Sequence, residues 1–167
     1  MMSFIVVGLL SSPAFAATHI SVTTKGGKVG FIENGNFYWL GMKADEFEKK
    51  FGPYDLVSPN SYPRHDRDSD IYFEYETEGL TVGVKDGVVI DYQFSKLPQS
   101  VTLKGKPVKL TATLSAREVG KFLGPTLDRV STSGIQQTAF SYGGEVILFY
   151  HRNGRLSDLS MIKKQAY

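Results

Sequence analysis

The sequence predicts an α+β protein of two tandem repeats, each a short helical segment packed on an antiparallel β-sheet meander. Two stretches carry this prediction, residues 42–53 (MKADEFEKKFGP) and residues 114–125 (LSAREVGKFLGP). Each has the pattern of a short amphipathic helix ended by Gly-Pro, because glycine favours the C-terminal stop and proline forbids continuation. Both stretches are followed first by a Phe-x-Tyr segment, at residues 73–75 and 140–142, and then by a turn that contains glycine. These observations indicate one structural unit that occurs twice.

The first half begins with two predicted strands and an aromatic cluster. Residues 18–24 alternate in a way that is typical of an edge strand, and residues 28–31 indicate a returning strand. Residues 37–40 (FYWL) are the densest aromatic cluster and include the only tryptophan. Both core packing and ligand stacking are open interpretations for Trp39.

The two predicted helices have one apolar face each. In the first, the apolar face consists of Met42, Phe47 and Phe51, with Glu46 and Lys50 one turn apart on the charged side. The second helix begins at a capping box formed by Ser115 and Glu118. Its apolar face consists of Val119 and Leu123, which we expect to be buried, and Phe122, which we expect to be partly buried.

Residues 54–70 (YDLVSPNSYPRHDRDSD) form the longest stretch without a periodic pattern. Loops of this length inside a compact domain are usually functional or mobile. The alternation at residues 66–70 is similar to a calcium loop, but Ile71 stands where such a loop needs glycine and Thr77 where it needs glutamate. A solvated charged loop and a recognition element are the other interpretations.

The segments that remain predict two strand meanders. Strands are expected at residues 71–76, 80–85, 88–94, 108–112, 140–142, 145–151 and 156–162, with hairpin turns at Asp86-Gly87 and Asn153-Gly154. Residues 126–136 are expected to be a loop, and residues 96–106 a polar connection between the halves. We therefore place the first repeat at residues 17–97 and the second at residues 98–167.

Residues 1–16 have the pattern of a signal peptide. An apolar run at residues 4–10 is followed by Pro13 and by the small-x-small sequence Ala-Phe-Ala at 14–16, although no basic residue precedes the run. A buried N-terminal strand is the alternative. The chain has no cysteine, which excludes a lipid anchor on cysteine and a disulfide framework. The sequence therefore predicts an exported, soluble periplasmic protein without stable membrane insertion.

Composition and motifs argue against several classes of function. The net charge of +2 gives no field of one sign that would attract nucleic acid. His19, His65 and His151 lack metal-ligand spacing, and the sequence contains no nucleophile elbow, P-loop or dinucleotide fingerprint. Carboxylates are present on predicted strands at Glu74, Glu76, Glu78 and Glu145, but solvation explains them as well as acid–base chemistry. We predict a protein that binds no metal or cofactor and is not an enzyme.

Alternation along the strands assigns side chains to the two faces of the sheet. In the first half, the expected core face consists of Phe73, Tyr75, Leu80, Val82, Val84, Ile90, Tyr92 and Phe94, and the expected solvent face of Tyr72, Glu74, Thr81, Lys85, Asp91 and Gln93. In the second half, Ile147 and Phe149 belong to the core side, which leaves Leu148, Tyr150 and Leu156 opposite. Apolar residues there indicate either a contact patch or a core between the halves.

Tyrosine and arginine are enriched in protein-binding hot spots, and loop charges can pair with a partner. The predicted partner-binding residues are therefore Tyr62, Arg64, Asp66, Arg67, Asp68, Tyr72, Leu148, Tyr150 and Arg152.

The helix that ends in Phe-Gly-Pro or Leu-Gly-Pro and precedes a strand meander resembles a module of secreted bacterial proteins. Its tandem form is similar to the β-lactamase-inhibitor-protein-like (BLIP-like) fold, and its single unit is similar to the SmpA/OmlA domain of outer-membrane assembly lipoproteins. The resemblance rests on Ala44, Glu46 and residues 51–53, and on Ala116, Glu118 and residues 123–125. It implies a module whose curved sheet binds another protein, either a toxin or an envelope enzyme. We expect an immunity protein that neutralises a secreted toxin enzyme; the alternative is an envelope-assembly accessory factor.

Overall fold

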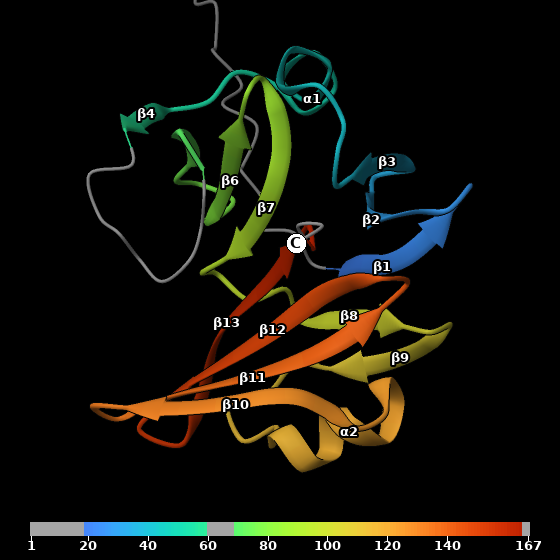
Figure 1. Ribbon diagram of the computed structural model, residues 1–167, viewed down its shortest axis with the longest axis vertical. Coiled ribbons are helices and arrows are strands. Elements are labelled where there is room, and N and C mark those ends of the chain that lie inside the picture. The colour runs from blue at the N-terminus through green and yellow to red at the C-terminus, as the bar shows by residue number, and fades with distance from the viewer. Residues whose placement is uncertain (1–18, 60–68, 165–167) are drawn as a thin grey trace, which may run out of the picture.

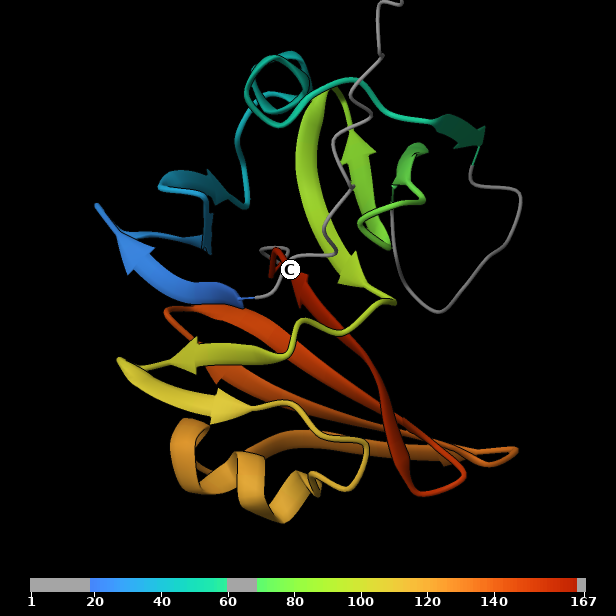
Figure 2. The same cartoon turned by 180° about the vertical axis from the view of Figure 1, so that it is seen from behind.

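The structure, a computed structural model, describes residues 19–59 and 69–164. Its described part is mostly β-sheet, with two helices, α1 (Ala44–Phe51) and α2 (Ala116–Leu123) (Figures 1 and 2). The strands are β1 (His19–Lys25), β2 (Lys28–Glu33), β3 (Asn36–Trp39), β4 (Leu56–Pro59), β5 (Ile71–Tyr75), β6 (Leu80–Lys85), β7 (Val88–Phe94), β8 (Ser100–Leu103), β9 (Lys106–Lys109), β10 (Thr126–Thr132), β11 (Ile135–Tyr142), β12 (Glu145–Arg152) and β13 (Arg155–Ile162). The predicted α+β class is confirmed.

The larger sheet has eight strands in the order β10-β11-β12-β13-β7-β6-β5-β4. It consists of two four-strand antiparallel meanders, and each follows one helix in the chain. The meanders join where β13 pairs with β7, for example at Met161 opposite Tyr92. Figure 1 shows the strong twist of this sheet between β4–β7 and β10–β12. Such a twist is the ordinary right-handed twist of strands accumulated over a wide sheet.

The smaller sheet has five strands in the order β3-β2-β1-β8-β9. Its central pair, β1 and β8, is parallel, and the other pairs are antiparallel. The prediction of an edge strand at residues 18–24 is therefore wrong, because β8, which follows only at Ser100, covers the other side of β1. Both sheets cross the expected boundary between residues 97 and 98, so the two halves share their sheets.

One core lies between the two sheets and the helices. Phe31 of β2 contacts Tyr92 and Phe94 of β7, with ring centroids 5.1 and 5.2 Å apart. Phe47 of α1 contacts the same Tyr92 ring at 5.6 Å, and α2 lies against the Phe140 ring of β11 at Gly120. Both helices and the smaller sheet thus cover the same face of the larger sheet, which we call the inner face. We call the opposite face the outer face.

The local signals in both helices and both hairpins are confirmed. Phe47, Val119 and Leu123 are buried, and the side chain and backbone of Ser115 form the capping box with Glu118. The Lys50 ammonium lies 2.8 Å from the Glu46 carboxylate. The turns at residues 86–87 and 153–154 have positive φ at both positions, as type I′ hairpins require.

Four strands were not predicted from the sequence. β10 lies in the expected loop at 126–136, β8 in the expected connection at 96–106, β4 in the irregular stretch at 54–70, and β3 in the aromatic cluster at 37–40. β9 was expected, but it begins two residues before the predicted strand at 108–112. Three of the unpredicted strands, β3, β4 and β8, have only four residues, and every residue of β10 is exposed. Apolar and polar side chains alternate along a strand when one of its faces is buried and the other is exposed. A very short strand, or one with both faces exposed, therefore carries little of this signal.

A β-bulge changes the expected faces of the first half. Gly83 pairs with Asp91 but Val84 pairs with Val89, so Ile90 is the extra residue. Val89, which is fully buried, therefore occupies the place on the inner face that the sequence assigned to Ile90. Asp91 lies on the outer face as expected, but it is buried rather than solvated, with 1% of its surface exposed.

Candidate functional site

The predicted partner-binding residues fall into two groups in the structure. Tyr62, Arg64, Asp66, Arg67 and Asp68 lie outside the described residues, and so do residues 1–16. The flanks of that segment are described, since Pro59 at the end of β4 pairs with Ile71 at the start of β5. The second group, Tyr72, Leu148, Tyr150 and Arg152, lies on strands of the larger sheet.

This second group does not form one cluster. Tyr72 and Tyr150 both belong to the outer face, but β6, β7 and β13 separate their strands. At a strand spacing of about 4.8 Å, the strands that carry the two residues are roughly 19 Å apart across the sheet. Leu148 is only 4% exposed, so its burial argues against it as a contact residue. Tyr150 is half-buried and Arg152 is exposed, and these two residues remain candidates for partner binding.

Around Tyr150, the sheet register builds a line of side chains from the edge to the centre of the outer face. Val130 of β10 pairs with Gln137 of β11, Gln137 pairs with Tyr150 of β12, and Tyr150 pairs with Asp158 of β13. We call these four residues the transverse row. Exposure falls along it, from 47% at Val130 to 6% at Asp158.

The carboxylate at the inner end of the transverse row holds an arginine in place. Asp158 Oδ1 accepts a hydrogen bond from Gln93 Nε2 at 3.3 Å, and Asp158 Oδ2 lies 3.6 Å from Arg152 Nε. The Arg152 side chain is 57% exposed, whereas that of Asp158 is 8% exposed. A buried carboxylate that engages one side of the guanidinium leaves its other donors directed to solvent. The arrangement is an exposed cation two residues along the strand from the half-buried Tyr150, on the same face of the sheet.

Sequence reasoning missed Asp158, Gln93 and Val130 as parts of this site. Asp158 and Gln93 lie 65 residues apart and come together only because β13 pairs with β7. A bulge in β12–β13 at Tyr150 and His151 then separates Asp158 from Leu156, which sequence alternation had put on one face. Leu156 is 4% exposed and belongs to the main core, so its expected place on the outer face is wrong.

Exposed apolar side chains gather at the two edges of the larger sheet. At one edge they are Leu127, Val130 and Ile135, with 58, 47 and 38% exposure, and at the other they are Tyr54, Leu56 and Val57, with 36, 49 and 39% exposure. The signal in the sequence that could have revealed the first edge is Ser133-Gly134, which forms a positive-φ turn between β10 and β11. Exposed apolar groups at a sheet edge are typical of contact surfaces.

The neighbours of Trp39 distinguish between core packing and ligand stacking. Its half-buried ring packs against the main core. The ammonium groups of Lys28 and Lys50 lie 4.3 and 5.0 Å from the ring centroid, within the range of cation–π contact. These contacts favour the structural interpretation of Trp39 over ligand stacking.

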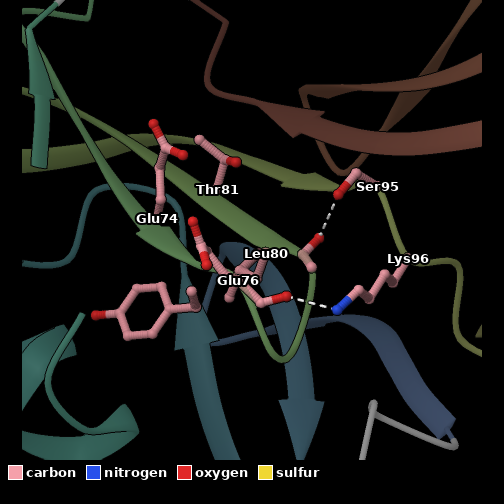
Figure 3. A pocket seen from close by; sticks show the side chains of 8 residues that line it. Glu74, Glu76, Leu80, Thr81, Ser95 and Lys96 are labelled. Atoms are coloured by element: carbon pink, nitrogen blue, oxygen red, sulfur yellow. Dashed lines mark hydrogen bonds between the residues drawn. The ribbon is translucent and has the colours of Figure 1, made fainter. Parts of the chain in front are cut away.

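A shallow depression of about 220 Å³ lies beside the turn between β5 and β6 (Figure 3). Its only ammonium group, from Lys96, donates to the carbonyl oxygens of Glu76 at 2.6 Å and Thr77 at 3.2 Å. Ser95 Oγ donates to Gly79 O at 3.0 Å, as the dashed lines in Figure 3 show. The carboxylate of Glu74 accepts a hydrogen bond from Ser58. These polar groups hold the turn in shape.

Metal ligands do not gather in the described part of the chain. Within residues 19–59 and 69–164, no three His, Cys, Asp or Glu side chains lie together as a metal site. His151 is buried, and its Nε2 lies 2.7 Å from Leu114 O, which links β12 to the segment just before α2. In the same ranges, no helix has both the length and the apolar character needed to cross a membrane.

Glu33 at the end of β2 is the carboxyl group with a raised pKa. Burial raises its pKa above the usual 4.5, and the charge of Glu78 adds to the effect. Above its pKa, the ionised group is partly desolvated and repelled, so it destabilises the fold; as the pH falls through that pKa, protonation removes this cost.

Glu33→Gln is therefore expected to raise the thermal unfolding midpoint at pH 7, with a smaller gain below pH 4.5, where the wild-type carboxyl is protonated too. The measurement is thermal unfolding by circular dichroism at both pH values. Glu46→Gln is the control, because Glu46 is paired with Lys50 at the surface and its loss should give no gain. An equal gain from Glu33→Gln at both pH values would contradict the assignment.

Comparison with known proteins yields one remote structural neighbour. No family model matches the chain, and no curated protein matches it. The fold is similar to the crystal structure of a DUF4309 family protein, YjgB, from Bacillus subtilis subsp. subtilis str. 168, with 12% sequence identity and a TM-score of 0.44. The similarity covers 73% of this chain and 78% of that one.

Proposed function

We propose that this chain is an exported, periplasmic protein-binding module that inhibits or neutralises a partner protein, most concretely as an immunity protein against a secreted toxin enzyme. The observation that carries the proposal is the outer-face arrangement of Tyr150 beside Arg152, which Asp158 holds at 3.6 Å. Arginine and tyrosine are the side chains most often found at the energetic centre of protein interfaces. An arginine already oriented by a buried carboxylate loses less conformational entropy when a partner binds.

The geometry of the outer face supports binding to a large partner. A specific protein interface buries about 800 Å² on each side, which requires a broad surface rather than a pocket. Accessible residues of the outer face lie toward the β10 side of the larger sheet, at Val130, Gln137, Tyr150 and Arg152, whereas Asp91, Leu148 and Ser160 nearer its centre are buried. The apolar Val130 at one end of the transverse row and the cation of Arg152 near the other give this surface mixed chemistry.

The proposal includes the origin of the chain from a duplicated unit, as in the BLIP-like fold that the sequence resembles. Each half contributes a helix followed by a four-strand meander to the larger sheet. Phe47 and Val119 occupy matching places in α1 and α2, and both are fully buried. In this proposal the repeated scaffold supplies the sheet, and the differences between the copies, such as Arg152 and β10, supply the contacts.

The first test is co-purification from cells that produce the tagged chain. We expect a partner protein to be recovered with the wild type and to be reduced about tenfold or more with Arg152→Ala or Tyr150→Ala, as hot-spot residues require. Arg117→Ala is the matched control, because Arg117 is an exposed arginine on α2 rather than on the outer face.

The second test asks whether binding neutralises. The recovered protein, produced in the periplasm on its own, should arrest growth, and co-production of the wild-type chain but not of Arg152→Ala should restore it. A partner that binds through Arg152 without any toxicity would overturn the immunity role. Equal recovery with all three variants would overturn the binding surface itself.

A further inference from the structure

The four edge strands of the two sheets differ in how they are protected. β3, β9 and β4 have only four residues each, and two of them contain proline, Pro107 in β9 and Pro59 in β4. Short edges and prolines are the usual means by which proteins keep an edge from pairing with another chain. β10, the edge beside β11, has seven residues and contains neither proline nor lysine.

The exposed side of β10 is open along its whole length. Every residue from Thr126 to Thr132 is exposed, so no helix or loop of the described chain covers the strand. Among the described residues, β10 pairs with β11 alone, which leaves its outward N–H and C=O groups without a neighbouring strand. One irregularity, a bulge at Leu127, interrupts the pairing near its start.

We infer that β10 receives an extended segment of the partner protein, which adds to the larger sheet as a ninth strand. This inference rests on the proposed function and names how the partner engages the sheet. Main-chain hydrogen bonds to an open edge supply affinity in this mode of recognition, and alternate side chains supply specificity.

Charge defines the segment that fits. Asp128 and Val130 lie on the outer face, opposite Ala139 and Gln137, whereas Arg129 lies on the inner side, opposite Thr138. Asp128 Oδ1 accepts a hydrogen bond from the backbone N–H of Arg129 at 2.7 Å, and both side chains are exposed. The complementary segment therefore carries a basic residue opposite Asp128, an acidic residue opposite Arg129 and an apolar residue opposite Val130.

The edge is continuous with the proposed binding surface. Val130 is the outermost member of the transverse row, so a strand paired with β10 places its own side chain next in line with Val130, Gln137 and Tyr150. With strands about 4.8 Å apart, that side chain would lie roughly 14 Å from Tyr150. A partner of ordinary interface size can contact β10 and Arg152 together.

A second copy of this chain fits the edge less well. In a two-fold antiparallel pair, a residue near the axis faces itself or residues an even number of positions away, because opposite residues must share a face. Registers centred on Asp128 or Arg129 therefore put like charges opposite each other. The complementary pair of Asp128 with Arg129 of the other copy is not available in any such register.

The experiment selects binders from a phage library of random seven-residue peptides on the immobilised full chain. We expect enriched peptides with an acidic residue between a basic and an apolar one, and slower hydrogen exchange at residues 126–132 when a synthetic copy is bound. Val130→Lys should weaken peptide binding about tenfold. Val57→Lys, the same change at the opposite edge of the sheet, should leave it unchanged.

Each outcome separates the inference from its alternatives. Peptides that bind Val130→Lys as tightly as the wild type, or that leave exchange at 126–132 unchanged, would overturn it. Self-association of the free chain in sedimentation, lost in Val130→Lys, would assign the edge to a second copy instead. Peptide binding at β10 without any capture of a protein through Arg152 would leave the edge inference standing and overturn the proposed function. Capture of a partner protein that is lost in Arg152→Ala but unchanged in Val130→Lys would overturn the edge inference and leave the proposed function standing.

Discussion

Replacing Phe47 with alanine is expected to lower the free energy of unfolding by about 3–5 kcal/mol, the usual cost of truncating a buried phenylalanine. Phe47 is fully buried, and its ring contacts four other aromatic rings. These rings belong to Tyr38, Phe51, Tyr75 and Tyr92, with centroids 5.3, 5.0, 5.8 and 5.6 Å away. Tyr38 lies on the smaller sheet and Tyr92 on the larger, so the truncation opens the core where both sheets meet α1.

Equilibrium unfolding in urea measures this loss, with Phe122→Ala as the control. Phe122 is a phenylalanine on α2 that is only partly buried against the core, and no ring contact of it was found among the described residues. Its truncation should cost clearly less than that of Phe47, because less apolar surface and no ring cluster is lost. A cost for Phe47→Ala equal to or below that for Phe122→Ala would show that the rings around Phe47 do not organise the core.

The parts of the fold that were predicted from the sequence are those with local signals. Both helices end at Gly-Pro, and the two hairpins turn at Asp-Gly and Asn-Gly. These residue types are favoured at helix ends and in positive-φ turns, so they mark such places in the sequence. The strands that were missed lack such signals. β8 is the clearest case: its place beside β1 depends on residues 81 positions away, and periodicity within four residues cannot indicate a parallel partner.

The candidate site was predicted in part, and the limit is physical. Alternation correctly put Tyr150 and Asp91 on the outer face, because period-two alternation holds within a regular strand. It failed for Ile90, which is itself the extra residue of a bulge, and for Leu156, which lies next to one. It also could not reveal that Asp158 holds Arg152 and accepts a bond from Gln93, since that contact exists only when β13 pairs with β7.

The junction of the halves predicts cooperative behaviour of the whole molecule. β13 pairs with β7 in the larger sheet and β8 with β1 in the smaller one, so each half completes both sheets of the other. Residues of both halves also form one hydrophobic core. Separate halves would expose two open strands and half of that core, which is unfavourable for a domain of this size.

Gly30→Ala is expected to cost about 3 kcal/mol of unfolding free energy, at the upper end for one methyl group forced into a packed site. Gly30 lies in β2 opposite Trp39 of β3. A Cβ there would lie 1.9 Å from Tyr38 O and 2.6 Å from Trp39 Cα. Both atoms are backbone, so no side-chain rotation relieves the contact, and β3 must move away from β2 together with the Tyr38 ring that packs on Phe31.

The same substitution elsewhere in the chain provides the control for Gly30→Ala. Gly120 lies inside α2, and a Cβ there would meet only the Phe140 ring at an ordinary 3.8 Å. Gly120→Ala should therefore raise the free energy of unfolding by up to about 1 kcal/mol, because alanine loses less backbone entropy than glycine in a helix. Denaturant unfolding of both variants should show opposite signs. A Gly30→Ala variant as stable as the wild type would mean that β2 and β3 do not approach each other as closely as the structure places them.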